Sequence, residues 1–111
     1  MEEQLELLRE IRNQLTQKYR GFYLCNIYAE IRNIQMYDER WMNRRKLFEE
    51  EIPLFTYENA LEFNAVDISG SEQIDMYSWW YGDNLQDRLA FVDWMIEVIQ
   101  LKEDKFVLNS F

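Results

Sequence analysis

The chain has 111 residues, of which 48% are hydrophobic and 16% aromatic, and its 21 acidic and 12 basic side chains give a net charge of −9. This length suits one folded domain over residues 1–111, and the apolar content excludes a disordered chain. With no histidine and one cysteine, the composition excludes histidine-based catalysis, an internal disulfide and a thiolate-rich zinc site.

The acidic excess lies in the second part of the chain. Residues 1–50 hold nine acidic and nine basic side chains, whereas residues 51–111 hold twelve acidic and three basic ones. Phosphate backbones and anionic lipids need clustered lysine and arginine, so direct binding to nucleic acid or membrane is disfavoured. The start of the chain lacks the features of a secretory signal, and no apolar run has the length of a membrane span. We expect a cytoplasmic protein.

The first predicted helix covers residues 2–19. Its acidic side chains Glu2, Glu3 and Glu6 suit the positive end of the helix dipole. The apolar stripe is shorter than four heptads, so it favours packing within the chain over a coiled-coil dimer. The stripe consists of Leu5, Leu7, Leu8, Ile11, Leu15, Tyr19 and Phe22.

A second predicted helix covers residues 22–34 and carries the single cysteine, Cys25, on or near its apolar face. Because no histidine is available to activate a thiol, we expect Cys25 to be a small buried hydrophobe. The apolar positions of this helix are Leu24, Ile27, Tyr28, Ile31 and Ile34.

A third helix is predicted to begin after the N-cap residue Asp38 and to end near Glu51, before Pro53. It contains the main basic cluster of the chain, followed directly by three glutamates. The pairs Arg45–Glu49 and Lys46–Glu50 are four residues apart, in the weaker order with the base first. The cluster is either a solvated charged face or a contact for an anion or partner, made by Arg40, Arg44 and Arg45.

Residues 54–83 are ambiguous. The alternation at residues 61–66 is typical of a strand, yet Thr56 could cap a short helix over residues 57–64, which we favour. Residues 67–77 have the composition of a loop. Residues 67–78 lack the glycine and the final glutamate of a calcium loop, so no metal site is expected.

The last predicted helix runs from residue 84 to residue 101 and is capped by Asp83 or Asn84. Residues 106–111 are expected to be extended or loosely packed. The fold expected from these elements is an all-α bundle of about four helices, with a partly irregular, aromatic-rich connection before the last one. The core stripe of that helix is predicted to be Leu85, Leu89, Val92, Ile96 and Ile99, flanked by Phe91, Trp94, Met95 and Val98.

The segment MYSWWYGD, at residues 76–83, gathers aromatic side chains next to a glycine. These aromatics either cover one end of the core or anchor a partner, since tryptophan and tyrosine dominate the energetics of interfaces. Residues 51–87 hold eight acidic side chains and no basic one. A surface for a basic partner is therefore predicted at Glu58, Glu62, Asp75, Tyr77, Trp79, Trp80 and Tyr81.

Two stretches, GFYLCNIY at residues 21–28 and YSWWYGDNLQDRLAFVDWMI at residues 77–96, together resemble small proteins encoded by bacteriophages and prophages. In those proteins the Trp-Trp pair is often followed by proline, whereas Tyr81 stands in that place here. The resemblance implies a phage or mobile-element setting, in which small acidic proteins often bind and inhibit host machinery. It implies no catalytic activity.

The sequence predicts a non-catalytic protein that binds and inhibits or modulates a host protein with a basic surface, and no cofactor is expected. The surface also allows a homodimer. The alternative is an oligomeric nucleotide binder, in which aromatic rings stack a base and arginines such as Arg40 or Arg88 hold phosphate. An enzyme using only carboxylates is disfavoured, because such mechanisms need a large cleft.

Overall fold

The computed structural model describes residues 2–17, 23–65 and 84–109, with side chains up to residue 105 in the last range. No strand occurs in these ranges, which confirms the all-α expectation and the preference for a helix after Thr56. The helices are α1 (Glu2–Gln17), α2 (Leu24–Ile31), the 3-10 helix η1 (Glu39–Asn43), α3 (Arg44–Glu51), α4 (Tyr57–Glu62) and α5 (Leu85–Asn109).

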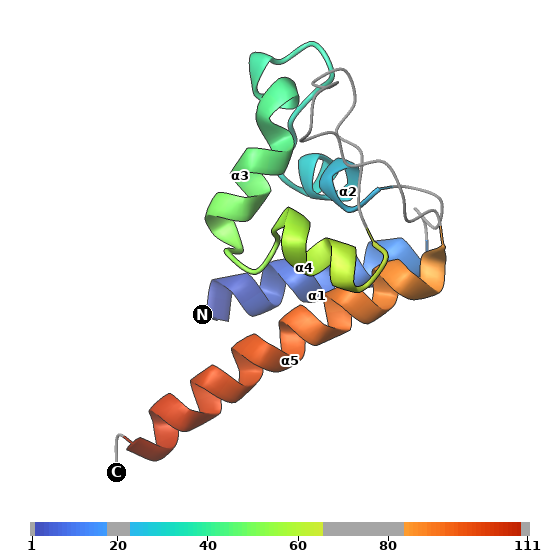
Figure 1. Ribbon diagram of the computed structural model, residues 1–111. Coiled ribbons are helices and arrows are strands. Elements are labelled where there is room, and N and C mark those ends of the chain that lie inside the picture. The colour runs from blue at the N-terminus through green and yellow to red at the C-terminus, as the bar shows by residue number, and fades with distance from the viewer. Residues whose placement is uncertain (1, 18–22, 66–83, 110–111) are drawn as a thin grey trace.

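Helices α1 and α5 lie side by side and run in opposite directions (Figure 1). Two exposed contacts join them: Arg12 Nε donates to Asp93 Oδ1 at 2.5 Å, and Arg9 Nη2 donates to Gln100 Oε1 at 2.8 Å. Helices α2, α3 and α4 pack around this pair, whereas the C-terminal end of α5 extends away from the other helices (Figure 1).

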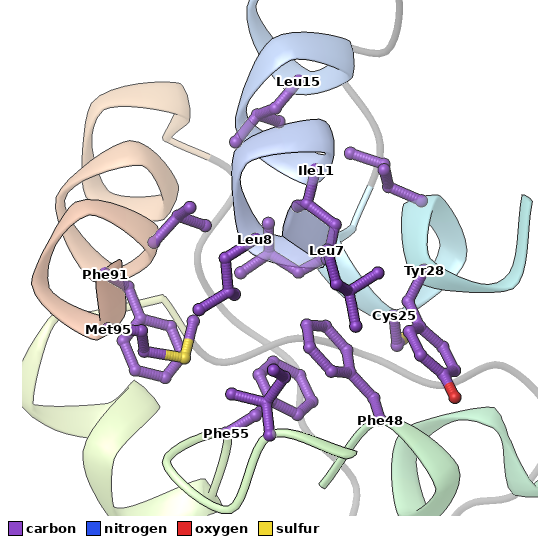
Figure 2. Packing of buried hydrophobic residues seen from close by; sticks show 14 of the residues in the cluster. Leu7, Leu8, Ile11, Leu15, Cys25, Tyr28, Phe48, Phe55, Phe91 and Met95 are labelled. Atoms are coloured by element: carbon purple, nitrogen blue, oxygen red, sulfur yellow. The ribbon is translucent and has the colours of Figure 1, made fainter. Parts of the chain in front are cut away.

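Aromatic rings connect the helices through the core. The Phe48 ring stacks on Tyr28 at 4.7 Å and on Phe55 at 3.9 Å between ring centres, and Phe55 lies 6.0 Å from Phe91. Figure 2 shows these rings beneath the apolar side of α1. The series joins α2, α3, the turn after α3 and α5, so these elements share one continuous core.

The predicted apolar face of α1 is confirmed over residues 5–15, whereas its members Tyr19 and Phe22 lie outside the described residues, and the assignment of Cys25 is confirmed. Leu5, Leu8, Ile11 and Leu15 are all buried, and the Cys25 thiol is buried and free of any disulfide. The Cys25 Sγ donates a weak hydrogen bond to Asn26 Oδ1 at 3.8 Å. Burial among apolar side chains agrees with a packing role for this cysteine.

Side-chain caps begin three of the elements as the sequence indicates. The Asp38 carboxylate accepts from the backbone N–H of Arg40 at the start of η1. Thr56 Oγ1 accepts from Asn59 N at 3.1 Å, and Asn84 Oδ1 accepts from Gln86 N at 2.8 Å. Each cap satisfies a backbone donor that has no partner inside its helix.

Helices α2 and α4 end earlier than predicted, in one common way. Asn33 and Asn64 follow them with φ of 57° and 55°, in the left-handed region that asparagine tolerates better than most residues. The next backbone N–H then bonds back across the turn, from Ile34 to Ala29 O at 2.9 Å and from Ala65 to Ala60 O at 2.8 Å. This Schellman geometry stops both helices and buries the residue that follows.

The structure corrects two expectations about α5. The helix continues to Asn109, so an extended tail is wrong for residues 106–109. The buried face of α5 is also rotated from the predicted core stripe toward the residues predicted to flank it. The reason is that the aromatic series and α1 pack against the flanking residues. Leu85, Leu89 and Ile96 are only half-buried, and the buried apolar side chains are Phe91, Val92, Met95 and Ile99.

The substitution Phe48→Ala should lower the free energy of unfolding by about 3–5 kcal/mol, because it removes a ring packed on both faces and leaves a cavity. Urea denaturation would measure the loss. Leu101→Ala is the control, since Leu101 is 54% exposed, and it should change stability by less than about 0.5 kcal/mol. Similar effects of the two substitutions would contradict the aromatic series as the centre of the core.

Candidate functional site

A groove of about 590 Å³ lies between the first half of α1 and the C-terminal ends of α2 and α3. Three carboxylates line it from α1, at Glu3, Glu6 and Glu10. Their spacing of three and four residues places them on one face of the helix. The remaining lining residues are Gln4, Leu7, Ile31, Arg32, Glu51 and Ile52.

The position of the groove follows from how α1 packs. Leu5, Leu8 and Ile11 face the core, so the row of glutamates comes to the edge where α1 meets the other helices. Gln4 Nε2 donates to the backbone carbonyl of Glu51 at 3.0 Å and ties α1 to the end of α3.

Glu51 is the polar centre of the groove. Two nitrogens of Arg32 bind the Glu51 carboxylate: Nε donates to Oε2 at 3.0 Å, and Nη2 donates to Oε1 at 2.6 Å. The Tyr28 hydroxyl donates a short hydrogen bond to Oε2. Hydrogen bonding from Arg32 lowers the pKa of Glu51, and burial together with the bond to Glu51 raises the pKa of the Tyr28 hydroxyl. The carboxylate therefore stays ionised and the hydroxyl stays a donor at neutral pH.

The charge of the groove is strongly negative. It contains four carboxylates, and Arg32, the basic residue of the lining, is already bound to one of them. Glu3, Glu6 and Glu10 are exposed, and within the described ranges their carboxylates lie in no ion pair with a basic residue. The arrangement can attract and hold basic side chains.

The predicted basic cluster divides into residues with different environments. Arg44 is 1% exposed, so it cannot meet an anion or partner at the surface in this structure. Its Nε donates to Asn26 Oδ1 at 2.7 Å and its Nη1 donates to Trp41 O at 2.6 Å, and its guanidinium lies 4.0 Å from the Trp41 ring centre. Arg40 is exposed and bound to Asp38 at 2.6 Å, and Arg45 is half-buried.

Only two members of the predicted partner surface lie within the described residues. Glu58 and Glu62 are exposed on α4, four residues apart, and the Leu61 side chain beside them is 46% exposed. Neither glutamate lines the groove. Asp75, Tyr77, Trp79, Trp80 and Tyr81 lie outside the described residues, and the prediction for them stays a prediction.

Sequence reasoning did not identify the groove. The helix dipole explains why Glu3 and Glu6 lie near the start of α1. It does not explain Glu10, which lies four residues further along the helix. The row of three acids on one helical face was the available signal. The contribution of Glu51 and Arg32 depends on contacts between distant parts of the chain, which periodicity does not show.

Comparison of the chain with protein-family models, with curated proteins and with solved structures gives no match. In the described part of the chain, no helix is both long enough and apolar enough to cross a membrane. Within the same ranges, there is no group of three or more acidic or cysteine side chains that could hold a metal ion. The site is therefore argued from its own geometry.

The bond between Glu51 and Arg32 should make stability depend on pH. Because the pKa of Glu51 is lowered in the folded state, its contribution is present above the unfolded pKa near 4.5 and is lost as pH falls through the lowered value. Both side chains are more than a third exposed, so the contribution should be about 1 kcal/mol or less.

Denaturation at a series of pH values would compare the wild type with Glu51→Gln. The stability difference should be largest near neutral pH and should vanish in acid. The control Glu49→Gln removes an exposed carboxylate that lies in no ion pair within the described residues, and it should leave the acid profile unchanged. An unaltered profile in Glu51→Gln would contradict this assignment.

The substitution Arg44→Ala should destabilise the fold by about 2 kcal/mol or more, because it removes buried packing against Trp41 and the hydrogen bonds that the guanidinium donates to Asn26 and to the Trp41 carbonyl. Thermal and urea unfolding would measure the effect. Arg40→Ala, at an exposed pair, should cost much less. If Arg44→Ala left stability unchanged, the interior role of this arginine would be wrong.

Proposed function

We propose that the protein acts by binding a partner protein with a basic surface, without catalysis, and that it inhibits or modulates that partner by covering the surface. The observation that carries this proposal is the row of Glu3, Glu6 and Glu10 along a groove whose arginine is already bound to Glu51. The negative charge of this row is not compensated by the groove itself, so it is available to lysine and arginine from outside.

The dimensions of the row favour a polypeptide over a small ion. Glu3 and Glu10 are seven residues apart, which is about 10 Å along a helix axis. A partner helix with basic residues at the same spacing could present one to each carboxylate, and the side chain of Ile31 offers a partly exposed apolar contact beside them. Opposite charges would mainly speed the encounter, and contacts in the groove would slow dissociation.

In the phage setting that the sequence resemblance implies, the proposed partner is a host protein in the cytoplasm whose basic surface normally holds nucleic acid or takes part in defence. Carboxylates in the groove would compete with phosphates for the same lysines and arginines. The acidic segment at residues 51–87, with Glu58 and Glu62 on α4 as its described members, is the alternative contact region that the test below compares with the groove. The nucleotide-binding alternative gains no support, since Arg44 and Arg88 are both buried.

The test uses a synthetic lysine-rich helical peptide as the probe, titrated against the full chain by fluorescence anisotropy. Two double variants remove the same charge at the same spacing: Glu6→Gln with Glu10→Gln in the groove, and Glu58→Gln with Glu62→Gln on α4. We expect the groove variant to bind the peptide about tenfold more weakly, equivalent to about 1.4 kcal/mol, and the α4 variant to bind within about twofold of the wild type.

The same variants, used as bait in a host lysate, would show whether a cellular partner depends on the same residues. Equal losses in the two variants would indicate attraction by net charge alone and would contradict a groove site. A loss confined to the α4 variant would instead assign binding to the segment at residues 51–87.

A further inference from the structure

Helix α3 carries its charges in an order that is unfavourable within a single helix. Its sequence, RRKLFEEE, places three basic residues in the first turn and three glutamates in the last. The helix dipole favours the opposite distribution, and base-before-acid pairs four residues apart are the weaker kind. The ends of the helix are satisfied by other elements, since Arg44 is buried against Trp41 and Glu51 binds Arg32.

One face of α3 remains exposed and has no such partners among the described residues. Lys46, Glu49 and Glu50 are exposed, and in the ranges that the structure describes they form no ion pair and no side-chain hydrogen bond. With Pro53, they line a shallow hollow of about 400 Å³ on one face of the helix. This face, defined by Lys46, Glu49, Glu50 and Pro53, is called the α3 face below.

We propose that the α3 face binds the α3 face of a second copy of this chain, with the two helices antiparallel about a two-fold axis. If the axis passes between Leu47 and Phe48, Lys46 of each copy lies opposite Glu49 of the other. This pair occurs twice, because a two-fold interface uses the same surface on both partners. The order of charges that is unfavourable along one helix is thus complementary between two.

Apolar surface lies at both ends of α3. Met42, which is 44% exposed, belongs to η1 just before this helix, and the exposed Pro53 follows just after it. The two helix dipoles are also antiparallel, so the basic first turn of each copy meets the acidic last turn of the other. The charges of the α3 face are thus complementary to those of its own copy, which favours a second copy as the occupant.

The pairing predicts a dimer that depends on concentration and on salt. A helix of eight residues is about 12 Å long, so its face buries less than the roughly 800 Å² per partner of a standard stable interface. Exposed ion pairs are weakened when the Debye length falls, from about 10 Å at 0.1 M salt to about 3 Å at 1 M. Glu3, Glu6 and Glu10 take no part, so this inference stands apart from the proposed function.

Sedimentation equilibrium of the full chain, from about 10 µM to 1 mM protein, tests the proposal with charge reversals. Lys46→Glu places glutamate opposite glutamate, and Glu49→Lys places lysine opposite lysine. We expect the dimer dissociation constant of each single variant to rise by about tenfold or more. The double variant, with both reversals in one chain, restores opposite charges and should dimerise about as well as the wild type.

A mixture of the two single variants gives a second readout. Each fails alone, but Lys46→Glu in one chain and Glu49→Lys in the other set opposite charges at both contacts, so the mixture should form a heterodimer. Circular dichroism of each variant confirms that the helices are retained. A wild type that stays monomeric up to 1 mM would overturn the proposal, and so would a dimer that none of these reversals weakens.

Discussion

Three helices of this protein are joined at Glu51, and the groove exists because they meet there. Its carboxylate accepts hydrogen bonds from Tyr28 and Arg32 of the α2 region, and its backbone carbonyl accepts one from Gln4 of α1. The stacked rings of Tyr28 and Phe48 lie directly beneath, so the polar contacts and the aromatic core support each other. A residue at the end of an eight-residue helix thereby helps to hold the longer helix α1, which docks as well through its apolar face and through its hydrogen bonds to α5.

The charged residues separate into those that build the fold and those that remain available. Arg12, Arg32 and Arg40 are each bound to a carboxylate, and Arg44 is enclosed by Trp41 and Asn26. Several of the acidic side chains, in contrast, lie on the surface without a basic neighbour in the described residues. Each ion pair cancels one acidic charge with one basic charge, so the acidic excess of the composition remains on side chains outside these pairs.

Local patterns were sufficient for much of the fold. Apolar spacing located the buried side of α1, and the caps Asp38, Thr56 and Asn84 were recognisable because each acts within a few residues. The early helix ends at Asn33 and Asn64 were missed, since the sequence alone does not show which asparagine takes the left-handed conformation that ends a helix. The buried Arg44, the rotated face of α5 and the groove were missed for a different reason. Each of these features depends on contacts between segments that are distant in sequence. The aromatic surface predicted before α5 lies outside the described residues, so its prediction stays a prediction.

Helix α5 has two parts with very different surroundings, and this has a consequence for how the molecule opens. Around Phe91 the helix is enclosed, whereas beyond Ile99 it leaves the bundle and its side chains at residues 101, 102, 104 and 105 are exposed (Figure 1). Amide protons in the distal turns can therefore exchange with solvent through local fraying, while those near Phe91 exchange only when the whole core opens. Hydrogen exchange along this one helix therefore reports both the free energy of local fraying and that of global unfolding. A label or tag attached at its C-terminal end would leave the core undisturbed.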